Sequence, residues 1–129
     1  MSADSFLYQI PRDLTINPAD VLKEGWLSKQ SKFLKEWRRR WCVLTPKYFC
    51  SFKGKDFARL KPTEIIPVQY CCGIRSADDD INQENAFRLD THDRIFFLVA
   101  DSTVDKEAWI GFIGRQMMRP NVAAEYIDT

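Results

Sequence analysis

Basic side chains gather in one short stretch of the sequence, from Lys29 to Trp41 (KQSKFLKEWRRRW). This stretch holds six positive charges and a single acid, Glu36. Arg38 and Arg40 are two residues apart, so in a strand they project from the same face. A guanidinium binds two phosphate oxygens at once, and a lysine adds a compact charge. The spacing therefore predicts a site for an anion of high charge density, for which a phosphomonoester is the natural candidate.

The charge of the chain is polarised along the sequence. The net charge is only +1 over 129 residues, yet residues 23–61 contain 12 Lys and Arg against 3 Asp and Glu, a balance of +9. The rest of the chain has a balance of −8. A fold that keeps residues 23–61 together at one end would present a positive face to an anionic partner.

Two large apolar residues, Phe33 and Leu34, lie in the middle of the basic stretch. They either pack against the domain or form a loop tip that enters the interface of a bilayer. Burial of either side chain is worth about 1.5–3 kcal/mol, and each nearby cation adds about 1 kcal/mol at an anionic surface. In the second interpretation the charges find the membrane and hold a phosphate, while the apolar pair slows release.

The elements that must position these residues are short β-rich runs separated by turn residues. The pattern predicts a mainly β fold, a small barrel or sandwich of seven strands with one C-terminal helix plugging an end. The helix is expected to begin at a Ser102 cap and to stop at Pro120. Pro67 favours an edge position for the fourth strand. The predicted strands cover residues 25–30, 37–45, 48–53, 64–69, 70–75, 86–91 and 94–100, with an acidic loop at residues 76–85.

Length and composition favour one folded domain, with 45% hydrophobic residues. We expect that domain at residues 23–118, after a linker or arm at residues 1–22 that docks loosely, and before a C-terminal tail at residues 119–129. The sequence has no run of eighteen apolar residues and no signal-peptide pattern at its start. The expected location is therefore the cytosol, with peripheral recruitment to membranes.

No catalytic or metal-binding pattern stands out. The sequence has no CxxC pair, and His92 is its single histidine, so we expect reduced, mostly buried thiols and no metal site. Nucleophile-elbow and Gly-rich phosphate-cradle motifs are also missing, so neither an enzyme nor a cofactor is predicted. The cysteines are Cys42, Cys50, Cys71 and Cys72.

Residues 23–44 (KEGWLSKQSKFLKEWRRRWCVL) closely resemble the start of a pleckstrin-homology (PH) domain, most like those of protein kinase B and the cytohesins. The shared features are a Gly-Trp-Leu-x-Lys strand, a loop with a lysine, and Trp-Arg-x-Arg-aromatic opening the next strand. A lone tryptophan, Trp109, seven residues after Ser102, is a second signature. The similarity covers about residues 23–118 and implies a seven-stranded, strongly bent barrel capped by the helix.

The resemblance also implies a function, that of a non-catalytic module recruited to membranes by anionic phospholipid headgroups. Lipid-binding PH domains use a lysine of the first strand and two basic residues of the second, and some add a basic residue from a later strand. Phe33 and Leu34 would insert in the interface. The matching headgroup ligands are Lys29, Arg38, Arg40 and Arg94, and the surrounding basic field would come from Lys32, Lys35, Arg39 and Lys61.

Two positions depart from the cytohesin-like pattern. Ser51 stands where those domains place a ligand-binding tyrosine, and Thr63 stands where they carry a basic residue. The set of residues that would select a trisphosphate lipid is therefore incomplete. A simpler headgroup, such as phosphatidic acid, which certain acylated PH-domain proteins read, stays open beside the phosphoinositides.

A second function class remains open, in which the same fold docks an acidic protein partner or a small GTPase. That class predicts binding that persists without lipid and maps to the acidic loop or to the helix. Nucleic-acid binding is not expected, because the basic stretch lacks a groove-reading helix or an RNA-stacking motif. The sequence does not indicate an oligomeric state.

Overall fold

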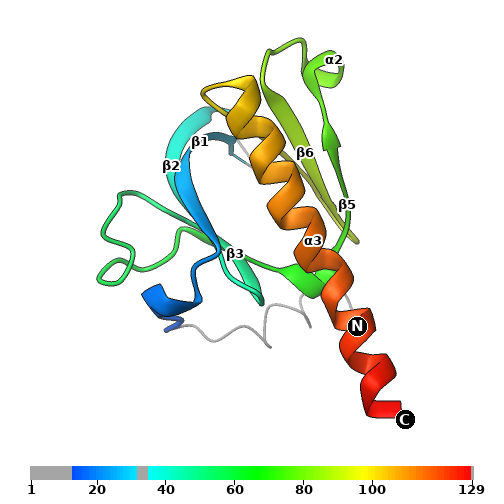
Figure 1. The fold of residues 1–129 in the computed structure, drawn as a ribbon. Helices are drawn as coiled ribbons and strands as arrows, with labels where there is room; N and C mark the ends of the chain where they lie inside the picture. Colours follow the sequence, from blue (N-terminus) through cyan, green and yellow to red (C-terminus); the bar gives the residue numbers. More distant parts are fainter. Residues whose placement is uncertain (1–12, 32–34, 129) are drawn as a thin grey trace.

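The computed structural model describes residues 13–31 and 35–128, with side chains as far as residue 118. Within these residues, seven strands form one antiparallel sheet in the order β4-β3-β2-β1-β7-β6-β5, and a long helix, α3, packs across it (Figure 1). This confirms the predicted seven-stranded fold with a C-terminal helix. The strands are β1 (Lys23–Gln30), β2 (Trp37–Leu44), β3 (Tyr48–Phe52), β4 (Glu64–Pro67), β5 (Cys71–Ser76), β6 (Ala86–Thr91) and β7 (Ile95–Val99).

The sheet bends around its core because β1 belongs to both halves of it. All eight residues of β1 pair with β2, whereas only Ser28 and Lys29 pair with β7. The apolar side chains of both halves meet inside, and α3 closes the core. Trp109 of α3 is fully buried there and meets Phe49 edge to face, with 5.7 Å between the ring centroids.

Helix α3 (Thr103–Asp128) begins where the sequence predicts and ends later. The Ser102 hydroxyl oxygen accepts a hydrogen bond from the Asp105 amide at 3.1 Å, which is the expected N-terminal cap. The prediction that Pro120 stops the helix is wrong. A proline removes one backbone donor and crowds the preceding turn, but its fixed φ is close to the helical value, so the residues after it can continue the helix. The last turns project beyond the sheet (Figure 1).

Several strand ends also differ from the sequence prediction by one or two residues. Strand β4 lies at the edge of the sheet, as expected, but it stops at Pro67 and gives way to a 3-10 turn, η2 (Val68–Tyr70). The acidic segment expected as a loop contains a short helix, α2 (Asp78–Ile81). Asp78 is held there because its carboxylate accepts bonds from the Ala86 amide at 2.8 Å and from the Lys106 ammonium at 3.3 Å.

The described part of the N-terminal arm lies on the outer face of the sheet. Ile16 is buried against Val43, Phe52 and Phe57, in a second apolar cluster separate from the main core. A 3-10 turn, η1 (Pro18–Asp20), then leads the chain into β1. Ile16 of the arm and Phe57 of the β3–β4 connection thus share this outer cluster, and the inner face of β2 and β3 is left to the main core.

All four cysteines are free thiols. Cys42 and Cys50 are buried, Cys71 is half-buried and Cys72 is exposed. Burial raises the pKa of Cys42, of Cys50 and of Cys71 to about 12, so these three thiols stay protonated near neutral pH. They are packing residues rather than nucleophiles.

Candidate anion-binding site

The pairing of β1 with β2 decides on which side each basic residue lies. Leu27 and Lys29 of β1 are buried and therefore face the interior. The residues directly opposite them are Arg40 and Arg38. Directly opposite residues of an antiparallel pair share a face. Arg38 and Arg40 therefore lie on the same side as Lys29, at the end of the sheet where β1 and β2 are joined.

Lys29 is a buried cation, with only 7% of its surface exposed. Its ammonium donates to the Ser51 hydroxyl of β3 at 3.1 Å and to a carboxylate oxygen of Glu64 on β4. It also lies over the Phe96 ring, 5.5 Å from the centroid. Burial lowers the pKa of Lys29 to about 8, and the nearby charges of Arg94 and Arg40 add to the lowering.

Arg94 reaches the same point from the segment just before β7. Its guanidinium stacks on Phe96, 4.1 Å from the ring centroid, and donates to the second carboxylate oxygen of Glu64 at 2.8 Å. Partial burial lowers the pKa of Arg94, which nevertheless stays charged at any physiological pH. The structure therefore brings Lys29 and Arg94 together around one aromatic ring and one carboxylate.

Arg38 and Arg40 have no buried acidic partner among the described residues. Arg38 donates to Glu36 at 3.2 Å, and both side chains of that pair are about half exposed. Arg40 donates to the backbone carbonyl of Arg39 at 3.1 Å. We call Lys29, Arg38, Arg40 and Arg94 the basic mouth.

Arg39, predicted as part of the surrounding field, lies on the other face of β2. It is opposite Ser28, and its guanidinium makes a two-pronged pair with Asp101, at 3.0 and 2.8 Å. It also covers the Trp26 ring at 5.4 Å. The hydrogen bonds from Arg39 lower the pKa of Asp101. The structure thus does not bring Arg39 together with the basic mouth.

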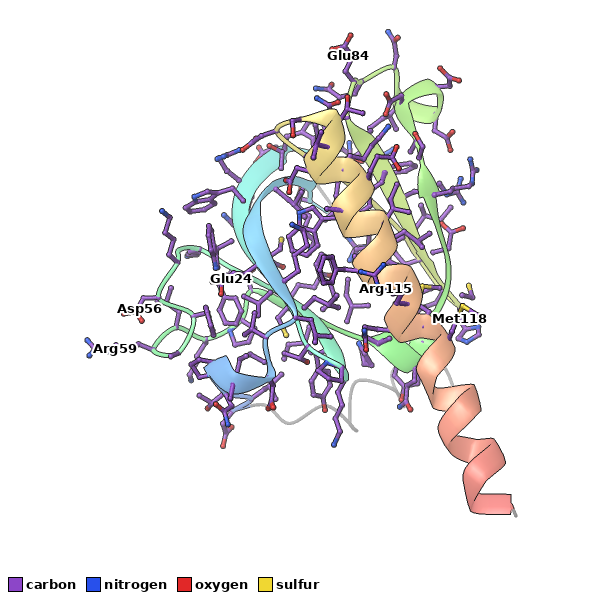
Figure 2. The ribbon with its side chains drawn as sticks, viewed as in Figure 1. Glu24, Asp56, Arg59, Glu84, Arg115 and Met118 are labelled. Atoms are coloured by element: carbon purple, nitrogen blue, oxygen red, sulfur yellow. The ribbon has the colours of Figure 1, made fainter. Side chains whose placement is uncertain are left out.

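Of the other predicted residues, two lie on connections between strands and three lie outside the described residues. Lys35 is exposed in the β1–β2 loop, with a φ of 54° that only a few non-glycine residues adopt. Lys61 is exposed in the β3–β4 loop, whose tip carries Asp56 and Arg59 (Figure 2). Lys32, Phe33 and Leu34 lie outside the described residues, so the predicted loop-tip insertion stays a prediction.

Glu64 is the functional candidate that the sequence interpretation missed. The sequence pattern predicts Glu64 only as the first residue of the fourth strand. The register places Glu64 opposite Ser51, and this pairing aims its carboxylate at Lys29. Thr63 and Ser51, the two positions that depart from the cytohesin-like pattern, are bonded to each other, the Thr63 hydroxyl donating to the Ser51 carbonyl at 3.0 Å.

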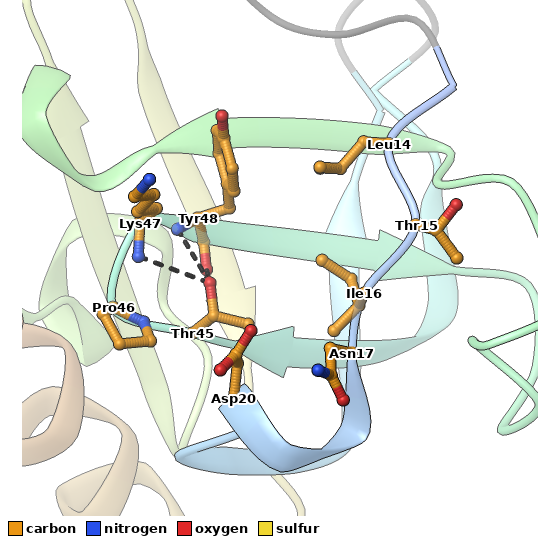
Figure 3. Close-up of a pocket in the computed structure, with 9 residues that line it drawn as sticks. All are labelled: Leu14, Thr15, Ile16, Asn17, Asp20, Thr45, Pro46, Lys47 and Tyr48. Carbon is orange, nitrogen blue, oxygen red and sulfur yellow. Dashed lines mark hydrogen bonds between the residues drawn. The ribbon is translucent and has the colours of Figure 1, made fainter.

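A hollow of about 240 Å³ lies elsewhere, between the N-terminal arm and the turn that joins β2 to β3 (Figure 3). Leu14, Ile16 and Tyr48 supply much of its apolar lining, and the Thr45 hydroxyl accepts from the backbone amide of Tyr48 at 3.1 Å. No residue of the basic mouth lines it. This hollow therefore offers no concentration of cations for an anion.

The basic mouth contains cationic hydrogen-bond donors of the kind that bind an oxyanion. Two guanidiniums supply paired donors, and a third guanidinium and an ammonium lie at its inner end. Among residues 13–31 and 35–118, no group of three or more His, Cys, Asp and Glu side chains is arranged to hold a metal ion. Within the described part of the chain, no helix has the length and apolar character needed to cross a bilayer.

Proteins of similar sequence include several that are named for a pleckstrin homology domain. The chain is 36% identical to the Arabidopsis thaliana pleckstrin homology domain-containing protein 1, over 75% of this chain and 69% of that protein. It is 31% identical to the mouse pleckstrin homology domain-containing family A member 2, over 73% of this chain and 23% of that protein. The chain thus spans most of the first relative but only about a quarter of the second.

Solved structures show the same fold. The C-terminal PH domain of pleckstrin in complex with D-myo-Ins(1,2,3,4,5)P5 superimposes with a TM-score of 0.61 at 27% identity, covering 74% of this chain and 97% of that one. The Slm1 PH domain in complex with phosphoserine gives 0.63 at 25% identity, covering 74% and 94%. The PH-domain family model matches residues 21–118. This family is generally non-catalytic. With the matched region spanning β1 to α3, the chain belongs to the PH-domain family.

Proposed function

We propose that this PH domain recruits its protein to membranes by binding the phosphate headgroup of an anionic phospholipid. Arg38 and Arg40 grip phosphate oxygens, and Lys29 and Arg94 complete the positive site at its inner end. The protein acts by binding alone, with no reaction at the site. Its working location is the cytosolic face of a membrane.

One observation carries this proposal. Arg38 and Arg40 of β2 lie on the inner face of the sheet, as the buried Lys29 of β1 does. Each of the two arginines is directly opposite an inward-facing residue of β1. Cations gathered this closely create a positive potential that attracts an anion. Arg38 and Arg40 meet only an exposed glutamate and a backbone carbonyl among the described residues, so they are available to an external anion.

The similar proteins add support of a general kind. One related PH domain was solved with an inositol pentakisphosphate and another with phosphoserine, so this fold accommodates phosphorylated ligands in those proteins. The headgroup proposed here carries a phosphomonoester, as phosphoinositides and phosphatidic acid do. Lys35 and Lys61 extend the positive field, together with Lys32, and Phe33 and Leu34 enter the bilayer interface.

Liposome co-sedimentation tests this function. Vesicles of phosphatidylcholine would carry phosphatidic acid, phosphatidylserine, or a phosphoinositide with one, two or three phosphomonoesters, at matched total charge. Wild type should bind a phosphomonoester lipid better than phosphatidylserine, and Arg38→Ala/Arg40→Ala should lose that preference. Equal binding to every anionic vesicle, lost as salt rises, would overturn the headgroup site and leave only a charged face.

The insertion of the loop tip has its own test. A Phe33→Ala/Leu34→Ala variant should still recognise the headgroup but should dissociate faster, because burial of each side chain contributes about 1.5–3 kcal/mol. Surface plasmon resonance on supported bilayers measures that off-rate. An unchanged off-rate, with Arg38→Ala abolishing binding, would remove the insertion from the proposal.

A protein-docking function is the second candidate. It is favoured by exposed apolar side chains on α3, where Val104 is 80% exposed and Met118, labelled in Figure 2, is 70% exposed. Docking of that kind would persist without lipid and would be weakened by Val104→Ser or Met118→Ser. The arginine double variant would leave it intact, so the two functions separate in one set of variants.

A further inference from the structure

Glu64 holds an unusual place inside the basic mouth. One of its carboxylate oxygens accepts from the Lys29 ammonium, and the other accepts from the Arg94 guanidinium at 2.8 Å. A carboxylate offers two acceptor oxygens to cations in the same manner as two oxygens of a phosphate. Glu64 therefore presents to Lys29 and Arg94 the same pair of acceptor oxygens that a phosphate group would present.

This arrangement divides the basic mouth into two unequal halves. Lys29 is 7% exposed and Arg94 partly buried, so leaving both without an anion would cost much desolvation energy, which Glu64 offsets. Arg38 and Arg40 form the outer half, which is more exposed and has no buried acid partner among the described residues. The outer half can accept a phosphate directly, whereas in the inner half one carboxylate already offsets part of the charge of the two cations.

We propose that Glu64 is an internal counter-anion that makes the mouth select headgroups with a single phosphomonoester over headgroups with two or three. This inference rests on the proposed headgroup function and names the residue that sets its selectivity. A first phosphate binds Arg38 and Arg40. A second phosphate on the same inositol ring would approach Lys29 and Arg94 and meet the Glu64 carboxylate, and two like charges that close repel each other.

The position of Glu64 in the fold lets its carboxylate influence which headgroup binds. Its side chain is 26% exposed, so the carboxylate remains within reach of an incoming headgroup. Strand β4 is an edge strand, and the register with β3 fixes Glu64 opposite Ser51, whose hydroxyl shares the Lys29 ammonium. Lys29 thus has two acceptors within the protein, the Ser51 hydroxyl and the Glu64 carboxylate.

The test compares two charge states at position 64. Glu64→Gln keeps the shape and removes the charge, whereas Glu64→Asp keeps the charge on a shorter side chain. Phosphatidylcholine vesicles would carry either a phosphatidylinositol monophosphate or a bisphosphate at equal total charge. For Glu64→Gln we expect the ratio of bisphosphate to monophosphate affinity to rise on the order of tenfold, since the repulsion is removed. Glu64→Asp should keep the preference of wild type.

A matched control separates a local effect from a change of net charge. Glu107→Gln makes the same charge change at an exposed position of α3, outside the mouth, and should leave the affinity ratio unchanged. Thermal unfolding of each variant shows that the comparison is made between folded proteins. If Glu64→Asp also increased bisphosphate binding, the preference would depend on the size of the side chain at position 64 rather than on its charge. That result would overturn the proposal.

The outcomes also separate the role of Glu64 from the headgroup function. If wild type binds the monophosphate lipid through Arg38 and Arg40, but Glu64→Gln leaves the ratio unchanged, the role of Glu64 is overturned and the headgroup function stands. A wild-type protein that prefers the bisphosphate has the same consequence. If neither wild type nor Glu64→Gln binds any phosphomonoester vesicle, the headgroup function falls, and the role of Glu64 falls with it.

Discussion

Lys29 is the residue at which burial and charge conflict most directly. Its ammonium lies inside the sheet with the Ser51 hydroxyl and the Glu64 carboxylate as acceptors. Burial is the largest cause that lowers its pKa to about 8, with Arg94 and Arg40 lowering it further and the Cys42 and Cys50 thiols acting in the opposite direction. Lysine contributes a positive charge only below its pKa, so the charge of the mouth changes just above neutral pH.

We therefore expect headgroup binding to weaken as the pH rises through about 8. Below that pH Lys29 is protonated and attracts the anion, and above it the lysine becomes neutral while Arg38, Arg40 and Arg94 stay charged. Co-sedimentation with phosphatidic acid vesicles between about pH 7 and pH 9 measures the change, a window in which a phosphomonoester gains rather than loses negative charge.

Lys29→Met supplies the control, because methionine fills a similar volume and does not titrate. This variant should bind more weakly than wild type, and its binding should not fall across the same pH range. A fall of equal size in both proteins would assign the pH dependence to another group and would contradict the role of Lys29.

Successive side chains of strand β2 point to opposite faces of the sheet, so residues that are adjacent in sequence are separated in space. Arg38 and Arg40 share the inner face, whereas Arg39 lies on the outer face and pairs with Asp101. The Arg39–Asp101 pair is about half exposed, and exposed pairs contribute about 0–1 kcal/mol to stability. Neighbouring arginines of one strand therefore have different expected roles.

The corresponding prediction contrasts single substitutions in this strand. Arg39→Gln should leave the preference for phosphomonoester vesicles unchanged, while Arg38→Gln and Arg40→Gln should each reduce it. The free energy of unfolding should change by no more than about 1 kcal/mol in Arg39→Gln, as measured by urea denaturation. Equal losses of binding in all three variants would show that only total charge matters.

Helix α3 depends on Trp109 to close the core. This side chain is fully buried against Phe49, and Gly25 of β1 lies beneath it, where an added Cβ would stand 3.7 Å from the indole ring. Trp109→Ala should lower the free energy of unfolding by about 3–5 kcal/mol, because it leaves a cavity that the sheet cannot fill.

Urea denaturation monitored by far-ultraviolet circular dichroism measures that loss. Val104→Ala is the matched control on the same helix, because Val104 is almost fully exposed and its change should stay within about 0.5 kcal/mol. Similar effects of the two substitutions would contradict the closing role of Trp109.

At the scale of the whole molecule, opposite charges are concentrated in different parts of the chain. The excess of +9 in residues 23–61 falls on β1, β2, β3 and their connections, whereas the rest of the chain is acidic. Such a polarised molecule orients in the field of an anionic surface before any specific contact forms. The field acts over about 10 Å at 0.1 M salt and about 3 Å at 1 M salt.

Binding to two anionic lipids should consequently respond differently to salt. Raising sodium chloride from about 0.05 M to about 0.5 M should almost abolish binding to phosphatidylserine vesicles, which depends on the field alone. Binding to phosphatidic acid should fall less, because short contacts in the basic mouth are screened less than long-range ones. Vesicle partition coefficients measure both, and equal losses would argue against a specific mouth.

The sequence contains enough information for much of this fold. Alternating β-rich runs and turn residues predict the seven strands, and a serine cap with an apolar periodicity predicts α3. These signals are local, since each depends on residues a few positions apart. The end of α3 was missed because Pro120 is a strong statistical stop signal, whereas its structural effect is confined to one hydrogen bond and one turn.

The cations, and the strand that presents Arg38 and Arg40 on one face, can be read from the sequence. The partners of these cations depend on the three-dimensional fold. Glu64 is 35 residues from Lys29 and Asp101 is 62 residues from Arg39, and nothing local in the sequence relates them. Strand register and the bend of the sheet bring such residues together. The same long-range pairing places the Glu64 carboxylate in the inner half of the mouth, whereas the described residues give the outer half no buried acid.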